Sequence, residues 1–67
     1  MKYIKECENN SCYNVQGIKP LYYINAYHEA NSDMHQYNIL RCEDCIEVFK
    51  FYWYDVEILK SYKETIQ

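Results

Sequence analysis

CENNSC at residues 7–12 and CEDC at residues 42–45 decide the fold of this 67-residue chain. These two segments carry all of its cysteines, which are Cys7, Cys12, Cys42 and Cys45. Two close thiol pairs that fold together supply the four ligands of a tetrahedral zinc ion. We therefore predict one structural Zn2+ bound by these four cysteines.

Two other states of the cysteines stay open at this stage, a pair of disulfides and a redox-active pair at Cys42 and Cys45. Disulfides persist in oxidising compartments. Residues 1–8, however, have no apolar run of the length that a signal peptide needs. A redox pair would leave Cys7 and Cys12 without a role. We therefore expect reduced thiols in a cytoplasmic protein.

The two histidines, His28 and His35, are the other candidate ligands. They flank a predicted turn at residues 29–34. An imidazole nitrogen is a common zinc ligand, so either histidine can replace a cysteine. Because four thiolates already fill a closed site, we favour surface histidines and leave the replacement as the alternative.

Chain length makes the metal important. At 67 residues the chain is expected to form one domain, residues 1–67, with a modest core. Zinc binding by a short structural site contributes roughly 10–16 kcal/mol at neutral pH, as much as the whole stability of an ordinary domain. A closed four-thiolate site also leaves no position for water or substrate, so we do not expect an enzyme.

The first half of the chain predicts a cysteine knuckle followed by a β-hairpin. Residues 9–11 between the first two cysteines are turn-forming asparagines and serine. Residues 21–27 are rich in aromatic and branched side chains, and residues 36–40 alternate between polar and apolar. These two stretches are expected to pair as antiparallel strands.

The second half predicts one long helix over residues 42–67. This segment has no glycine or proline, and Glu43 and Asp44 suit a helix N-terminus. Apolar residues at helical spacing are expected to face the hairpin, namely Cys45, Phe49, Tyr52, Val56, Leu59 and Ile66. The alternation of Phe49, Phe51 and Trp53 leaves a pair of strands as the alternative.

A second apolar stripe on this helix predicts a contact surface. It consists of Phe51, Tyr54, Ile58 and Tyr62, spaced by three, four and four residues. A small domain cannot bury both stripes, so we predict that these four residues bind another protein or a second copy of the chain. The alternative is that residues 1–4 or 15–21 cover this stripe.

In this order, the elements resemble the treble-clef group of zinc fingers, in which a knuckle supplies two cysteines and the second pair begins a helix. The resemblance implies a small zinc-stapled α+β domain with a knuckle, a hairpin and a C-terminal helix. Tyr13 stands where such fingers often carry glycine, and the first cysteine pair is spaced more widely than usual. An all-β zinc ribbon is therefore the alternative fold.

The net charge of the chain favours a protein partner over a nucleic acid. The formal net charge is −3, and a site of four thiolates with one Zn2+ carries a further −2. This balance disfavours phosphate binding, so a nucleic-acid-binding zinc finger is the second hypothesis, supported by nine tyrosines that can stack on bases. The chain has no uncharged stretch of 18 residues, so we predict no membrane-spanning segment.

Composition adds a prediction about origin. The chain is rich in lysine, isoleucine, asparagine and tyrosine, as expected from an AT-rich genome. In its size and acidity it resembles short phage-encoded regulatory or anti-defence proteins, including anti-CRISPR-type inhibitors. The resemblance implies a regulator or inhibitor of a larger protein complex, acting in a bacterial or phage-infected cell.

Overall fold

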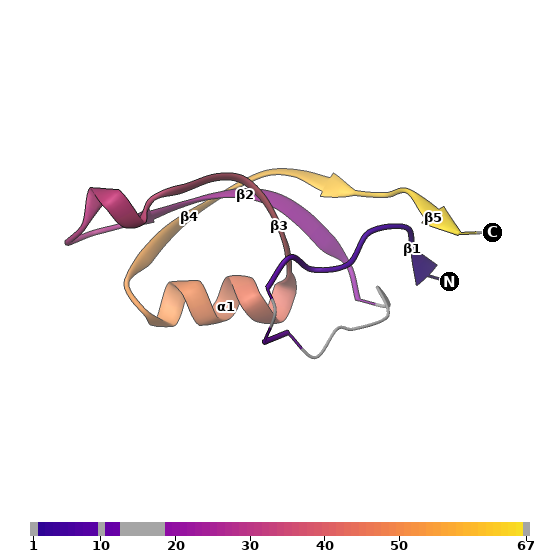
Figure 1. The fold of residues 1–67 in the computed structure, drawn as a ribbon, viewed down its shortest axis with the longest axis horizontal. Coiled ribbons are helices and arrows are strands. Elements are labelled where there is room, and N and C mark those ends of the chain that lie inside the picture. The colour runs from indigo at the N-terminus through magenta and orange to yellow at the C-terminus, as the bar shows by residue number, and fades with distance from the viewer. Residues whose placement is uncertain (1, 10, 13–18, 67) are drawn as a thin grey trace.

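A computed structural model describes residues 2–9, 11–12 and 19–66 (Figure 1). Their elements follow in the order β1 (Lys2–Tyr3), β2 (Leu21–His28), the 3-10 helix η1 (Ser32–Met34), β3 (Gln36–Cys42), α1 (Glu43–Phe51), β4 (Tyr54–Tyr62) and β5 (Thr65–Ile66). β3, β2 and β4 form a three-stranded antiparallel sheet, and β1 pairs with β5. The α+β class is confirmed.

The predicted hairpin is confirmed as β2 and β3. Their register pairs Leu21 with Cys42 and Ile24 with Ile39, and it shifts by one residue before Ala26. Asn38 lies at this irregularity with a φ of 52°, a conformation that asparagine tolerates better than most residues. Its backbone N–H donates to the side-chain oxygen of Asn25 at 2.8 Å, which fixes the irregularity in place.

The long helix predicted over residues 42–67 is wrong beyond Phe51. α1 begins at Glu43 with two acidic residues in its first turn and ends after nine residues. Residues 54–62 form β4. Aromatic and branched side chains alternate with acidic ones over residues 54–58, and pairing with β2 satisfies the backbone groups at the second edge of β2. The apolar residues of this segment fit the helical period as well as the two-residue period of a strand, so the helical spacing was misleading.

β2 is the central strand, with β3 on one side and β4 on the other. The molecule is elongated, with principal extents of 42 × 21 × 15 Å. Figure 1 shows α1 along one face of the sheet. The paired strands β1 and β5 lie at one end with both termini, and η1 lies at the opposite end.

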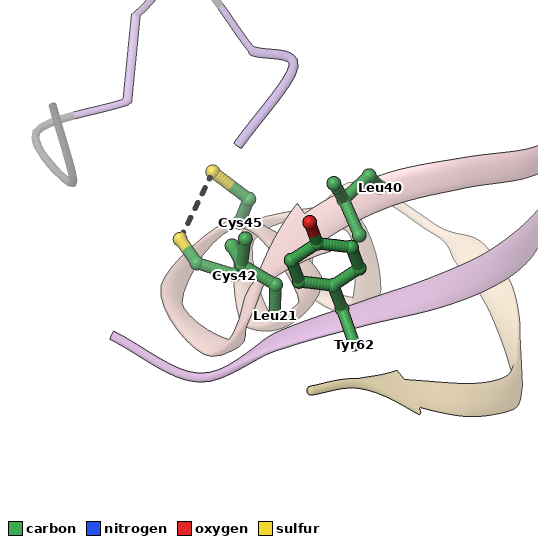
Figure 2. Packing of buried hydrophobic residues seen from close by; sticks show 5 residues of the cluster. All are labelled: Leu21, Leu40, Cys42, Cys45 and Tyr62. Carbon is green, nitrogen blue, oxygen red and sulfur yellow. Dashed lines mark hydrogen bonds between the residues drawn. The ribbon is translucent and has the colours of Figure 1, made fainter. Parts of the chain in front are cut away.

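Two groups of side chains form the core. The first is the cluster of Leu21, Leu40, Cys42, Cys45 and Tyr62, shown in Figure 2. The second comprises the buried residues outside this cluster, Ile24 and Ala26 on β2 and Ile46 on α1. Because neighbouring side chains of a strand point to opposite faces, Ile24 and Ala26 share one face of β2, and Leu21 lies on the other, where it packs in the cysteine cluster.

Replacement of a fully buried side chain tests this core. Leu40→Ala should lower the free energy of unfolding of the metal-loaded protein by about 2–5 kcal/mol, because it leaves a cavity beside Cys42 and Tyr62. Leu59→Ala, at a residue that is 45% exposed, should cost below about 1 kcal/mol. Denaturant unfolding followed by circular dichroism measures both, and equal losses would contradict this assignment of the core.

Candidate metal centre

The first cysteine pair lies on a tight turn of the N-terminal segment. The backbone N–H of Cys12 donates to the carbonyl of Asn9 at 2.9 Å, and the Asn9 side-chain oxygen accepts from the N–H of Ser11 at 3.0 Å. The N–H of Glu8 donates to the carbonyl of Leu40 at 3.1 Å and joins this turn to β3. The turn-forming residues thus bring Cys7 and Cys12 to the start of α1.

The second cysteine pair lies where β3 passes into α1. Cys42 is the last residue of β3 and the N-cap of α1, and its side chain makes no capping hydrogen bond. Serine, threonine, aspartate or asparagine normally caps a helix here. Cys45 follows one helical turn later, and both residues are buried. The sulfur at the N-cap position therefore serves the cysteine cluster instead of the helix.

The four sulfur atoms converge on one point, and all lie within 4.8 Å of one another. Cys7 Sγ lies 3.5 Å from Cys45 Sγ, and Cys12 Sγ lies 3.3 Å from Cys42 Sγ. Cys42 and Cys45 are 3.7 Å apart at their sulfurs (Figure 2). A disulfide needs about 2.05 Å, so these are four free thiols arranged to hold a metal ion.

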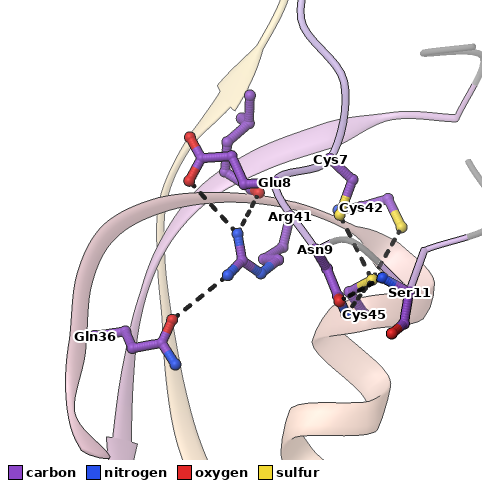
Figure 3. Close-up of polar contacts among 9 residues, drawn as sticks. Cys7, Glu8, Asn9, Ser11, Gln36, Arg41, Cys42 and Cys45 are labelled. Atoms are coloured by element: carbon purple, nitrogen blue, oxygen red, sulfur yellow. Dashed lines mark hydrogen bonds and ion pairs between the residues drawn. The ribbon is translucent and has the colours of Figure 1, made fainter. Parts of the chain in front are cut away.

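Two N–H groups point at the sulfurs (Figure 3). The side-chain amide of Asn9 donates to Cys45 Sγ, and the backbone N–H of Cys42 donates to Cys7 Sγ, each at 3.5 Å. Hydrogen bonds of this kind orient metal ligands and stabilise thiolate charge. Two of the four sulfurs, those of Cys7 and Cys45, thus accept an N–H hydrogen bond.

The thiols differ in their acidity in the absence of metal. Burial acts to raise the pKa of Cys7, but hydrogen bonds from the backbone of Asn9 and Cys42 outweigh it, so this pKa lies below its ordinary value. Burial raises the pKa of the Cys45 thiol, and its thiol neighbours raise it further. A metal ion that binds Cys45 at neutral pH therefore displaces a proton, and its affinity falls as the pH falls.

Arg41 fastens the turn to the sheet beside the cysteines (Figure 3). Its guanidinium lies 3.5 Å from the Glu8 carboxylate and donates to the side-chain oxygen of Gln36 at 3.4 Å. The same group lies 5.8 Å from the ring centre of Phe49 on α1. Arg41 thus links the cysteine turn, β3 and α1, and no sequence pattern had singled it out.

The histidines lie away from the cysteine cluster. His28 ends β2 and His35 precedes β3, at the end of the hairpin opposite to Cys42. A ring nitrogen of His35 lies 3.2 Å from the carbonyl of His28, and His28 packs against Tyr54 at 4.9 Å between ring centres. The metal-binding group among the described residues contains cysteines alone.

The predicted contact residues do not share one face. No helix extends past Phe51, so the helical stripe on which they were chosen does not exist. Tyr62 is buried in the core cluster, and Tyr54 is half-buried between His28 and Phe49. Phe51 and Ile58 are exposed. Their role in binding stays a prediction.

Sequence reasoning singled out Phe51 but missed the exposed surface that it forms with the next two residues, which we name the aromatic turn: Phe51, Tyr52 and Trp53. These three residues join α1 to β4 and are 77%, 61% and 70% exposed. Trp53 has a φ of 69°, in the left-handed region that usually follows a helix and is usually occupied by glycine. The sequence signal for this surface was the run of aromatic residues at positions 51–53, between the segment that became α1 and the alternating segment that became β4.

The chain matches no protein-family model, no curated protein and no solved structure. The treble-clef and phage-protein resemblances therefore stay predictions. Among the described residues, no helix has the length and hydrophobicity of a membrane-spanning segment.

The hydrogen bond from Asn9 gives a test of the metal centre. Asn9→Asp keeps an oxygen for the Ser11 N–H but removes the donor to Cys45, so metal affinity should fall by about 10- to 100-fold. Asn31→Asp keeps the cap of η1, far from the cysteines, and should leave the affinity unchanged. Competition with a chromophoric chelator measures both, and equal affinities would contradict a role for Asn9.

Proposed function

We propose that this chain is a small zinc-binding protein-interaction module. The zinc ion is structural, and the aromatic turn is the surface that contacts another protein. The module acts by occupying part of a larger protein or complex, as a regulator or inhibitor, and it turns over no substrate. Zinc binding rests on the cysteine cluster, and partner binding rests on the exposure of the aromatic turn.

The geometry of the cluster supports zinc. Four sulfurs around a zinc ion, with bonds of about 2.3 Å, lie about 3.8 Å apart in a regular tetrahedron. Three of the six sulfur separations, 3.3, 3.5 and 3.7 Å, are close to this edge, and all six lie within 4.8 Å. Thiolates are soft ligands that favour zinc over magnesium or calcium. Four ligands close the site, as in zinc sites that stabilise a fold.

The single observation that carries the contact proposal is the exposed side chain of Trp53 on an unfavourable left-handed backbone. Its left-handed backbone costs roughly 1–2 kcal/mol for a residue with a Cβ atom, and its side chain is 70% exposed. The fold gains little from this side chain at this position. Trp53 and its neighbours Phe51 and Tyr52 line a surface depression, and tryptophan and tyrosine dominate binding energy at protein interfaces.

Charge near the aromatic turn indicates the class of partner. The backbone N–H of Glu29 donates to the Trp53 carbonyl at 3.4 Å, which places this residue beside the turn, and Asp55 follows two residues later. Aromatic faces attract arginine guanidinium groups, and acidic neighbours strengthen that attraction. A protein surface with exposed arginines fits this turn better than an acidic one.

X-ray absorption at the zinc edge tests the metal. The spectrum of protein purified without added metal should show four sulfur neighbours at about 2.3 Å and no lighter ligand. A nitrogen neighbour at about 2.0 Å would show that a histidine replaces a cysteine, in conflict with the cluster described above.

Substitution of Trp53 separates stability from binding. Trp53→Gly should raise the free energy of unfolding by about 1 kcal/mol, because glycine accepts the left-handed backbone. It should also weaken partner binding by at least about 10-fold, as expected for a central aromatic. Leu59→Ser, at another exposed apolar residue, is the control.

Wild type and each variant are immobilised, and the proteins that they capture from cells are crosslinked and identified. The affinity of each variant for a captured protein is then measured. A partner that wild type and Leu59→Ser retain and Trp53→Gly loses supports the proposal. Identical captured proteins for all three would refute it. Loss of a dimer in Trp53→Gly, seen by native mass spectrometry, would identify the partner as a second copy of the chain.

A further inference from the structure

A pocket at the other end of β4 collects positive charge in this acidic chain. Three of its lining residues are lysines, one from the N-terminal segment and two from the end of β4 and the residues after it, and the others include two tyrosines: Lys5, Tyr23, Lys60, Tyr62, Lys63 and Glu64. Seven residues of the whole chain are lysine or arginine. We name this site the lysine pocket.

The charges of the lysine pocket are available to a ligand. Among the described residues, Lys5, Lys60 and Lys63 form no ion pair with a carboxylate. The one acidic side chain at the pocket, Glu64, accepts a hydrogen bond from Tyr62 at 3.3 Å. Three ammonium groups and one carboxylate leave the pocket positive. Charges are largely screened beyond about 8 Å at physiological salt, so the groups at the pocket weigh more there than the net charge of −3.

An aromatic ring forms one wall. The ammonium of Lys60 lies 5.1 Å from the ring centre of Tyr23, and Tyr23 packs edge-on against Tyr62 at 6.0 Å. Because this ammonium lies over one face of the ring, a base that stacks on that face takes its place, and the ammonium can then move to the phosphate. This combination suits a phosphate attached to a nucleoside, whose base can stack on tyrosine.

The same face of the sheet continues this surface. Tyr23, Asn25 and Tyr27 alternate along β2 and share one face, opposite to the face that carries α1. Tyr27 lies 5.7 Å from Tyr37 between ring centres, and Tyr37 is 60% exposed. A row of tyrosines thus leads away from the lysines along the face of β2 opposite to α1, past the Glu57 carboxylate, which accepts a hydrogen bond from Asn25 at 3.2 Å.

Size favours a chain over a free small molecule. The pocket has a volume of about 240 Å³, below the range of about 300–1,000 Å³ typical of sites that enclose a whole ligand. It admits a phosphate and the edge of one ring, while the rest of the ligand lies outside. A polymer of nucleotides can place one phosphate in the pocket and further bases along the tyrosines.

From this juxtaposition we infer that the lysine pocket and the tyrosine row bind single-stranded nucleic acid, with a phosphate at Lys60 and a base on Tyr23. This binding goes beyond the proposed protein contact and uses other residues. Bases of every kind have a stacking face, so recognition is tolerant of sequence.

Fluorescence anisotropy of a labelled oligothymidylate of about 12 nucleotides tests the inference on zinc-loaded, full-length protein. Wild type should bind at low salt, and the logarithm of its affinity should fall with the logarithm of salt concentration with a slope of about −2, as three lysine contacts predict for a single strand. Absence of binding at low salt would overturn the inference.

Charge-matched variants locate the site. Lys60→Gln should weaken binding by about 3- to 10-fold and lower the salt slope by about 0.7. Lys50→Gln, on α1 and paired with Glu47, makes the same change of charge elsewhere and should have no effect. Equal losses in both variants would mean that binding is diffuse, and the site would be rejected.

Variants of the ring test stacking. Tyr23→Leu should weaken binding by about 5- to 100-fold, whereas Tyr23→Phe keeps the ring and should bind as wild type does. Zinc content and circular dichroism confirm that each variant is folded. Thymidine monophosphate that binds as tightly as the oligonucleotide would overturn the assignment to a strand. Trp53→Gly should leave oligonucleotide binding intact, so this test and the test of the aromatic turn succeed or fail separately.

Discussion

The meeting of four thiol sulfurs is the constraint on which the rest of this structure depends. It joins the turn at residues 7–12 to the junction of β3 and α1. Cys42 and Cys45 also belong to the core cluster with Leu21, Leu40 and Tyr62, so the metal centre and the core are one unit. α1 has nine residues, fewer than an isolated helix needs to be stable in water. Its position therefore depends on the cysteines and on the packing of Ile46 against the sheet.

β4 separates two surfaces of the molecule, the aromatic turn and the lysine pocket. The aromatic turn precedes its first residue, and the lysine pocket surrounds its last ones. A nine-residue strand spans roughly 26–30 Å, so the two surfaces lie near opposite ends of the elongated molecule. The proposed protein contact and the inferred nucleic-acid contact therefore use separate surfaces.

The sequence predicts the parts of this fold that are fixed by local chemistry. Cysteine spacing identifies the metal-binding group, and β-forming residues identify the hairpin. It does not predict β4, because residues 54–62 satisfy both the helical and the alternating period, and pairing with the distant strand β2 decides between them. The turn at Trp53 lacks the usual glycine signal. The lysine pocket depends on residues 5, 60 and 63, which only the fold brings together.

The most direct test of the central claim is the far-ultraviolet circular dichroism of the purified protein before and after zinc removal by a chelator, with native mass recorded on the same samples. We predict one zinc per chain, loss of the folded spectrum on removal, and its recovery when one equivalent of zinc is restored. A metal-free protein with an unchanged spectrum would contradict it. So would a mass lower by about four hydrogens, which indicates two disulfides.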